Sequence, residues 1–104
     1  MQTPNDLIVK FSFNPDDFEK LDDFEEHLER AINFHGLGTY EGYELESEVG
    51  ENGEFYMTTT DGDLLFKTIK PLLADAGFLK VEKLVLQSSA DEGEIHQIKE
   101  YQLL

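Results

Sequence analysis

Apolar residues in this chain recur first with a period of two and then with a period near 3.6, and the chain makes this change twice. Residues 7–13 alternate, with four apolar side chains on one face, which predicts a strand at the centre of a sheet. Residues 15–35 carry their apolar side chains on one stripe at about 100° per residue, which predicts a helix. This succession of strands and helices indicates the α+β class.

The first predicted helix has signals at both ends and an acidic outer side. Asn14 is a good N-cap, Pro15 suits the first helical position, and Gly36 is expected to end the helix in the left-handed conformation. The charged residues that project away from the apolar stripe are Asp22, Asp23, Glu26, Glu29 and Arg30.

Residues 40–49 alternate again, and their polar face is strongly acidic. On this predicted strand Glu44, Glu46 and Glu48 oppose the apolar positions. A hairpin turn is expected at 51–54, followed by a returning strand at 55–60.

The sequence leaves two registers open for this hairpin. A strict two-residue turn pairs Val49 with Tyr56, whereas a five-residue loop pairs Val49 with Phe55. We favour the second, because it places Phe55 and Met57 beside the apolar face.

The second half of the chain predicts one more helix and two more strands. The helix starts near residues 60–63 and ends at Gly77, and Pro71 inside it is expected to kink it or split off its last turn. Residues 80–88 predict a strand rich in β-branched residues, and residues 94–103 predict a last, edge-like strand.

The predicted order of elements is β-α-β-β-α-β with a fifth strand added. We therefore expect one domain over residues 1–104, a ferredoxin-like βαββαβ sandwich with an additional C-terminal strand. Two helices would cover one face of its antiparallel sheet and leave the other face open. The open face suggests a homodimer, formed through sheet faces or through the last strand.

Negative charge is concentrated in the first part of the chain. The sequence has 23 acidic and 8 basic residues, a net charge of −15, and residues 1–63 alone hold 17 acidic and three basic residues, a net charge of −14. A field of this sign repels nucleic acids and anionic lipid, so no direct nucleic-acid or membrane partner is expected, and it attracts basic proteins. The alternative is that the charge only keeps the protein soluble.

The sequence also limits location and chemistry. The chain has no cysteine, so it has no disulfide, thiol nucleophile or thiolate metal site. Its first residues show no basic start followed by an apolar stretch, so no signal peptide and a cytoplasmic location are expected. No nucleophile–base pair and no phosphate-binding loop is evident, so we expect no catalytic residues and no cofactor.

Two groups of carboxylates are weak candidates for cation binding. Asp61 and Asp63 resemble the start of a cation loop, but capping of the second helix is the favoured interpretation. The row of Glu44, Glu46 and Glu48 would bind divalent cations weakly, and such charges on a strand also discourage aggregation.

Three tyrosines on the two hairpin strands are candidates for partner binding. The rings of Tyr40, Tyr43 and Tyr56 would be framed by carboxylates, which suits a basic partner, because tyrosine is enriched at interfaces. Packing of these rings against the fifth strand or a helix end is the equal alternative.

Residues 38–43 (GTYEGY) and 53–71 (GEFYMTTTDGDLLFKTIKP) resemble a group of small, uncharacterised bacterial proteins. Those proteins share a glycine-bounded acidic hairpin and a tyrosine-rich strand that leads into a Gly/Pro-Asp-x-Asp-x-Leu-Phe helix start, with a later Ile-x-Pro. The resemblance implies a ferredoxin-like fold and no known activity, so no functional residue is carried over. The positions that match are Asp61, Asp63, Leu65, Phe66, Ile69 and Pro71, whereas Thr59 and Thr60 replace the Gly-Pro.

The sequence therefore favours a non-catalytic interaction domain that docks a basic protein, for example as an immunity-type or inhibitory protein. Its acidic surface would come from residues 15–35 and 40–49. One alternative is a nucleic-acid mimic, which needs carboxylates spaced like phosphates. The other is a carboxylate-based cation-binding protein or enzyme.

Overall fold

The computed structural model describes residues 5–46, 52–88 and 97–102, and it is an α+β fold with one antiparallel sheet. The strand order is β2-β3-β1-β4-β5, so the first strand lies between the third and the fourth, as its apolar face predicts. The strands are β1 (Asn5–Phe13), β2 (Thr39–Leu45), β3 (Asn52–Thr59), β4 (Leu79–Ser88) and β5 (Gln97–Tyr101).

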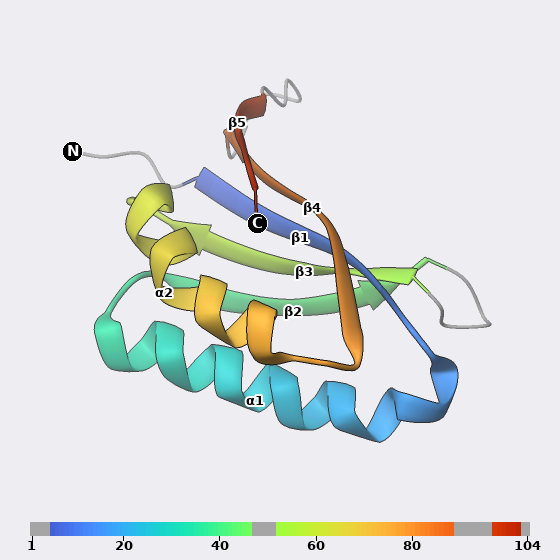
Figure 1. Ribbon diagram of the computed structural model, residues 1–104. Coiled ribbons are helices and arrows are strands. Elements are labelled where there is room, and N and C mark those ends of the chain that lie inside the picture. The colour runs from blue at the N-terminus through green and yellow to red at the C-terminus, as the bar shows by residue number, and fades with distance from the viewer. Residues whose placement is uncertain (1–4, 47–51, 89–96, 103–104) are drawn as a thin grey trace.

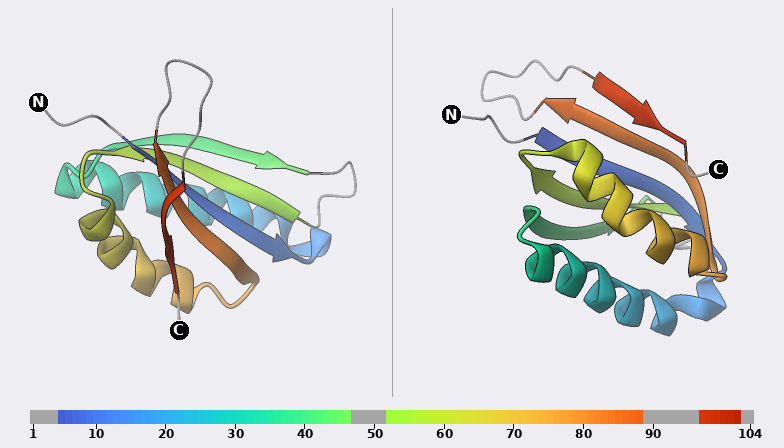
Figure 2. Two further views of the ribbon diagram at one scale, coloured as in Figure 1. Left: turned by 90° about the horizontal axis from the view of Figure 1, so that it is seen from above. Right: turned by 60° about the vertical axis from the view of Figure 1, so that its left-hand side comes forward.

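Two helices, α1 (Phe18–His35) and α2 (Gly62–Asp75), run antiparallel to each other over one face of the sheet (Figure 1). Figure 2 shows the same layering from two further directions. The apolar stripes of both helices meet the inner face of the sheet, where the burial of large apolar side chains is the main stabilising term. The most deeply buried of these side chains include Leu7, Val9, Phe11, Leu21, Leu28, Ile32, Phe55, Met57, Leu65, Ile69 and Leu84.

Both predicted ends of the first helix are confirmed. The side-chain oxygen of Asn14 accepts a hydrogen bond of 2.9 Å from the Asp16 backbone N–H, and Gly36 ends α1 in the left-handed conformation with φ 63°. The first turn, Pro15–Asp17, is a 3-10 helix, so the α-helix itself starts three residues later than predicted.

The register of the β2–β3 hairpin corrects both registers considered from the sequence. Leu45 lies opposite Gly53, and the backbone N–H of Glu46 donates to the carbonyl of Asn52 at 2.9 Å. The predicted turn at 51–54 is wrong, because β3 already begins at Asn52. Val49, on which both predictions were based, lies outside the described residues.

Gly53 is needed because the Phe11 ring and the backbone of β2 approach it closely, and not because the chain turns there. A Cβ atom at this position would lie 2.7 Å from the Phe11 ring and 2.9 Å from the Glu44 carbonyl oxygen. The absence of a side chain therefore allows β3 to lie between its two neighbours at the point where the Phe11 ring crosses it.

Replacing Gly53 with alanine should accordingly destabilise the fold by about 1–3 kcal/mol through overpacking. Urea unfolding of Gly53→Ala measures this loss. Gly77→Ala is the matched control, because a Cβ there meets nothing within 4 Å. Equal stability of the two variants would show that the close contact at Gly53 carries no strain.

A β-bulge in β2 changes which side chains share a face. The pairing with β3 shifts between Tyr40 and Gly42, and Gly42 has φ 116°. Strict alternation would put Tyr40 and Tyr43 on opposite faces. The extra residue, Glu41, puts both rings on the helix-covered face, where each contacts Phe55.

The second helix is capped by Asp61, as favoured from the sequence. The Asp61 carboxylate accepts a hydrogen bond of 3.1 Å from the Leu64 backbone N–H and caps α2. The helix continues through Pro71 to Asp75, so the proline does not split off its last turn. In the described part of the chain, no helix combines the length and the apolar character needed to cross a membrane.

The fifth strand extends the sheet beside β4 and is an edge strand, as predicted. It does not fold over the outer face of the sheet. Its Tyr101 ring stacks on Phe66 of α2 with centroids 4.4 Å apart, and its hydroxyl donates to Asp63 at 2.8 Å. These contacts fasten the edge strand to the start of α2.

Candidate functional site: an acidic groove beside helix α1

Four carboxylates lie on one flank of α1 because of their spacing. Residues three, four and seven positions apart are neighbours along a helix surface. Asp22, Glu25, Glu26 and Glu29 have this spacing, and Leu21 and Leu28 anchor the adjoining side of the helix in the core. The buried stripe therefore determines where this acidic flank points.

The flank faces the bulged part of β2, and together they form a groove. It is a hollow of about 300 Å³ whose residues we call the acidic groove: Asp22, Glu25, Glu26, Glu29, Tyr40, Glu41 and Gly42. The bulge contributes directly, because it turns Tyr40 toward the helix and leaves Glu41 exposed beside it. Five of the seven lining residues are carboxylates, and none of the seven is basic.

The floor of the acidic groove is held by a hydrogen bond between the helix and the strand. The half-buried Tyr40 hydroxyl donates to the Glu25 carboxylate at 2.7 Å. Burial, together with this bond and the charge of Glu25, raises the pKa of the Tyr40 phenol well above its ordinary value of 10.0. Tyr40 therefore stays a neutral donor and orients one carboxylate of the site.

Substitution of Tyr40 should show this coupling in the pH dependence of stability. Because the pKa of Tyr40 is raised in the folded state, its contribution is fully present below pH 10 and is lost as pH rises above the unfolded value. Tyr40→Phe should cost about 1 kcal/mol at neutral pH and reduce the loss of stability above pH 10. Denaturant unfolding between pH 7 and pH 11 measures both effects, and parallel pH profiles for the two proteins would contradict this account.

Countercharges in the acidic groove are few. Arg30 pairs with Glu26 at 3.3 Å, one turn along the exposed side of α1. Glu41 accepts a hydrogen bond of 3.4 Å from the Thr58 hydroxyl, which is uncharged. Asp22 and Glu29 make no ion pair with any residue that the structure describes. The groove therefore keeps most of its negative charge available to a ligand.

The structure separates the three tyrosines that the sequence predicted together. Tyr40 lines the acidic groove. Tyr43 is half-buried, with its ring 6.2 Å from Phe55 in an edge-on contact. Tyr56 of β3 lies opposite Gly42 of β2 and opposite Ile8 of β1, on the outer face of the sheet. Tyr40 and Tyr43 therefore lie on the helix-covered face and Tyr56 on the outer face, and the role of all three in partner binding stays a prediction.

Two members of the predicted row of glutamates lie near Tyr56, whose pKa is raised by burial and by the charges of Glu54, Glu44 and Glu46. Glu44 lies directly opposite Glu54 on the outer face of the hairpin, where the two like charges repel. Glu46 is exposed directly after β2, and Glu48 lies outside the described residues. The role of Glu44 and Glu46 in partner binding stays a prediction.

Asp61 and Asp63 are both engaged in holding secondary structure. Asp61 caps α2, while Asp63 accepts hydrogen bonds from Lys99 at 3.0 Å and from Tyr101. These two bonds lower the pKa of the Asp63 carboxyl. Among the described residues, no group of three or more histidine or acidic side chains is arranged to hold a metal ion.

The prediction from sequence missed most of the residues that form the acidic groove. It placed an acidic surface on residues 15–35 and 40–49 but named only Tyr40 among the lining residues as a site residue. The i, i+3, i+4, i+7 spacing of the four helical carboxylates was the available signal. Glu41 had none, because its position depends on the bulge.

Comparison of the chain with protein-family models, with curated proteins and with solved structures finds no match. Functional inference therefore depends on the geometry and charge of the site itself.

Proposed function

We propose that this protein is a non-catalytic interaction domain whose acidic groove docks a basic segment of a partner protein. The observation that carries the proposal is the convergence of five carboxylates, from α1 and the bulged part of β2, in one hollow without a basic lining residue. The net charge of −15 adds a long-range field of the same sign.

The acidic groove attracts a basic segment through its charge and orients that segment through carboxylates on both of its walls. Each exposed ion pair contributes only about 0.2–1 kcal/mol, so affinity requires several pairs formed together. Asp22 and Glu29, two turns apart on α1, and Glu41 on β2 border the hollow on two sides. Lysine or arginine side chains entering between them would meet carboxylates from both walls. Such a surface suits an inhibitor-type protein that covers a basic site on its target.

We also infer that the architecture is a ferredoxin-like arrangement extended by one strand. Support comes from the order β2-β3-β1-β4 of the first four strands and from the two helices on one face. The five-stranded order differs from the four-stranded arrangement because β5 is added beside β4.

Affinity capture from native lysate at two ionic strengths tests the proposed function. A basic partner should be retained at about 0.05 M salt and released at about 0.5 M, because exposed charge pairs are screened. Retention that is indifferent to salt would overturn the electrostatic basis of the proposal. Duplex DNA is then added as a competitor, and displacement of the partner by DNA would assign the groove to nucleic-acid mimicry instead.

A further inference from the structure

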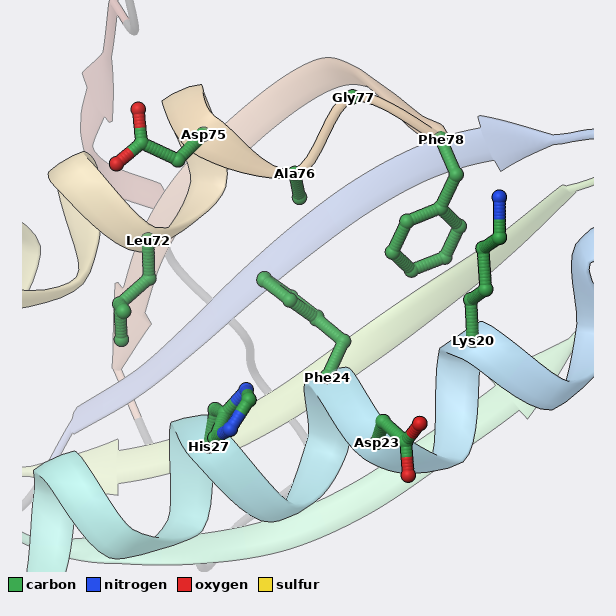
Figure 3. Close-up of a pocket in the computed structure, with 9 residues that line it drawn as sticks. All are labelled: Lys20, Asp23, Phe24, His27, Leu72, Asp75, Ala76, Gly77 and Phe78. Carbon is green, nitrogen blue, oxygen red and sulfur yellow. The ribbon is translucent and has the colours of Figure 1, made fainter.

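The flank of α1 opposite the acidic groove faces α2 across a second, mostly apolar hollow. This hollow, of about 350 Å³, lies beside the last turn of α2. Its floor is formed by Phe24 of α1, Leu72 of α2 and Phe78 of the following loop, and the Phe24 and Phe78 side chains approach each other there (Figure 3). The rings of Phe24 and Phe78 meet edge to face with centroids 6.0 Å apart. Such a hollow has the size and lining of a small ligand or side-chain pocket.

Beyond the hollow, each of the two helices carries an exposed apolar side chain. His27 lines the hollow, and Phe34 follows it by seven residues, close to two full turns, so both lie on the same side of α1. Phe34 is 85% exposed. On α2, Leu64 precedes Asp75 of the hollow by eleven residues, about three turns, and is also exposed. Because the helices are antiparallel (Figure 1), the end of α1, which carries Phe34, and the start of α2, which carries Leu64, lie on the same side of the fold.

In the interhelix groove, formed by the hollow together with Phe34 and Leu64, two carboxylates border the hollow. Asp23 and Asp75 border the hollow from the two helices and make no ion pair with any residue in the described part of the chain. The nearby Lys20 is paired with Asp17 at 3.2 Å. The groove therefore combines an apolar floor with uncompensated carboxylates, a combination that complements a basic amphipathic segment.

We propose that the interhelix groove receives the apolar face of a basic amphipathic helix of the partner. One large side chain of that helix fills the hollow between Phe24, Leu72 and Phe78, another packs on Phe34, and its cations meet Asp23 and Asp75. This inference rests on the proposed function and specifies its partner. A second copy of the chain is a poor occupant, because two molecules of net charge −15 repel each other.

A synthetic peptide with one tryptophan tests the inference directly, because the protein contains no tryptophan. The probe is a lysine/leucine amphipathic helix of about 18 residues, or five turns, with the tryptophan at the centre of its apolar face. The control peptide has the same composition in an order that breaks the apolar face. Binding should shift the tryptophan emission of the first peptide to shorter wavelength, and the control peptide should show no such shift.

Two substitutions and one matched control locate the bound peptide. Phe34→Ser and Leu72→Gln should each weaken binding of the amphipathic peptide about tenfold, since each removes apolar contact area. Phe18→Ser is the control, because Phe18 is also exposed but lies nine residues before His27, on the opposite side of α1.

Each outcome bears on one of the two proposals. Equal binding of both peptides, unaffected by Phe34→Ser and Leu72→Gln, would overturn the interhelix groove and leave the acidic groove as the docking site. A tryptophan shift that depends on those residues but not on salt would support the interhelix groove and contradict the electrostatic function. Self-association of the protein that Phe34→Ser abolishes would assign the groove to a second copy and overturn this inference.

Discussion

Reversing three carboxylates of the acidic groove, in the variant D22K/E29K/E41K, should weaken binding of the basic partner about 100-fold at low salt. Each reversal replaces an attraction by a repulsion, which is worth about 1 kcal/mol for exposed charges, and about 1.4 kcal/mol corresponds to a tenfold change in affinity. The three residues border the groove from both walls and are exposed. Glu25 is left intact, so its hydrogen bond with Tyr40 continues to hold the floor. Titration calorimetry with the captured partner measures the loss.

A matched variant separates a local groove from a general effect of charge. D16K/E82K/E100K makes the same change in net charge at three exposed residues that do not line the acidic groove. It should weaken binding only a few-fold, through the long-range field. An equal loss in the two variants would mean that total charge, rather than the acidic groove, attracts the partner.

Truncating Phe55 to alanine should have the largest effect on stability, about 3–5 kcal/mol. Its side chain is fully buried at the centre of β3, stacked on Phe11 with ring centroids 4.4 Å apart and in contact with Phe24 at 5.7 Å. The rings of Tyr40 and Tyr43 also contact it. The truncation therefore leaves a cavity bounded by residues from β1, α1 and β2, which the surrounding side chains fill only in part.

Chemical denaturation of Phe55→Ala and of Phe34→Ala measures this effect against a matched surface change. Phe34 is 85% exposed, so its truncation should change the free energy of unfolding by about 0.5 kcal/mol or less. Because small domains are stable by only about 5–15 kcal/mol, Phe55→Ala should also loosen the floor of the acidic groove. Similar stabilities of the two variants would contradict the position of Phe55 at the centre of the core.

Short sequence patterns correctly predicted those features that neighbouring residues in the chain determine. Asn14 and Gly36 specify the ends of the first helical region through a side-chain cap and a left-handed residue, and both were predicted. The alternation in residues 7–13 identified a central strand, since its inner face is fully apolar. Asp61 was predicted to cap α2 for the same kind of local reason.

Features that depend on contacts between strands were not predicted. The bulge at Glu41 and the register that pairs Leu45 with Gly53 are set by how β2 fits against β3 and beneath α1, not by any residue pattern within β2. Gly53 was interpreted as part of a turn, although its role is to admit the Phe11 ring. One extra residue in a strand changes the face of all that follow, and the bulge that places Tyr40 and Tyr43 on the same face was not predicted.

The candidate site was therefore predicted by region but not by residue. The distribution of charge along the sequence located the negative charge in residues 1–63. The groove itself requires the helical spacing of Asp22 and Glu29 together with a strand neighbour, Glu41, that only the tertiary fold brings to them. The hydrogen bond between Tyr40 and Glu25 joins residues fifteen positions apart and has no local signature.

The association rate constant of the captured basic partner, measured by stopped flow over a range of salt concentrations, tests most directly whether the acidic groove steers and holds that partner. We expect the rate for the unaltered protein to fall steeply with ionic strength, and the rate for D22K/E29K/E41K to be slower at low salt with a much shallower dependence. Identical rates and identical salt dependence for the two proteins would contradict the proposed role of the acidic groove.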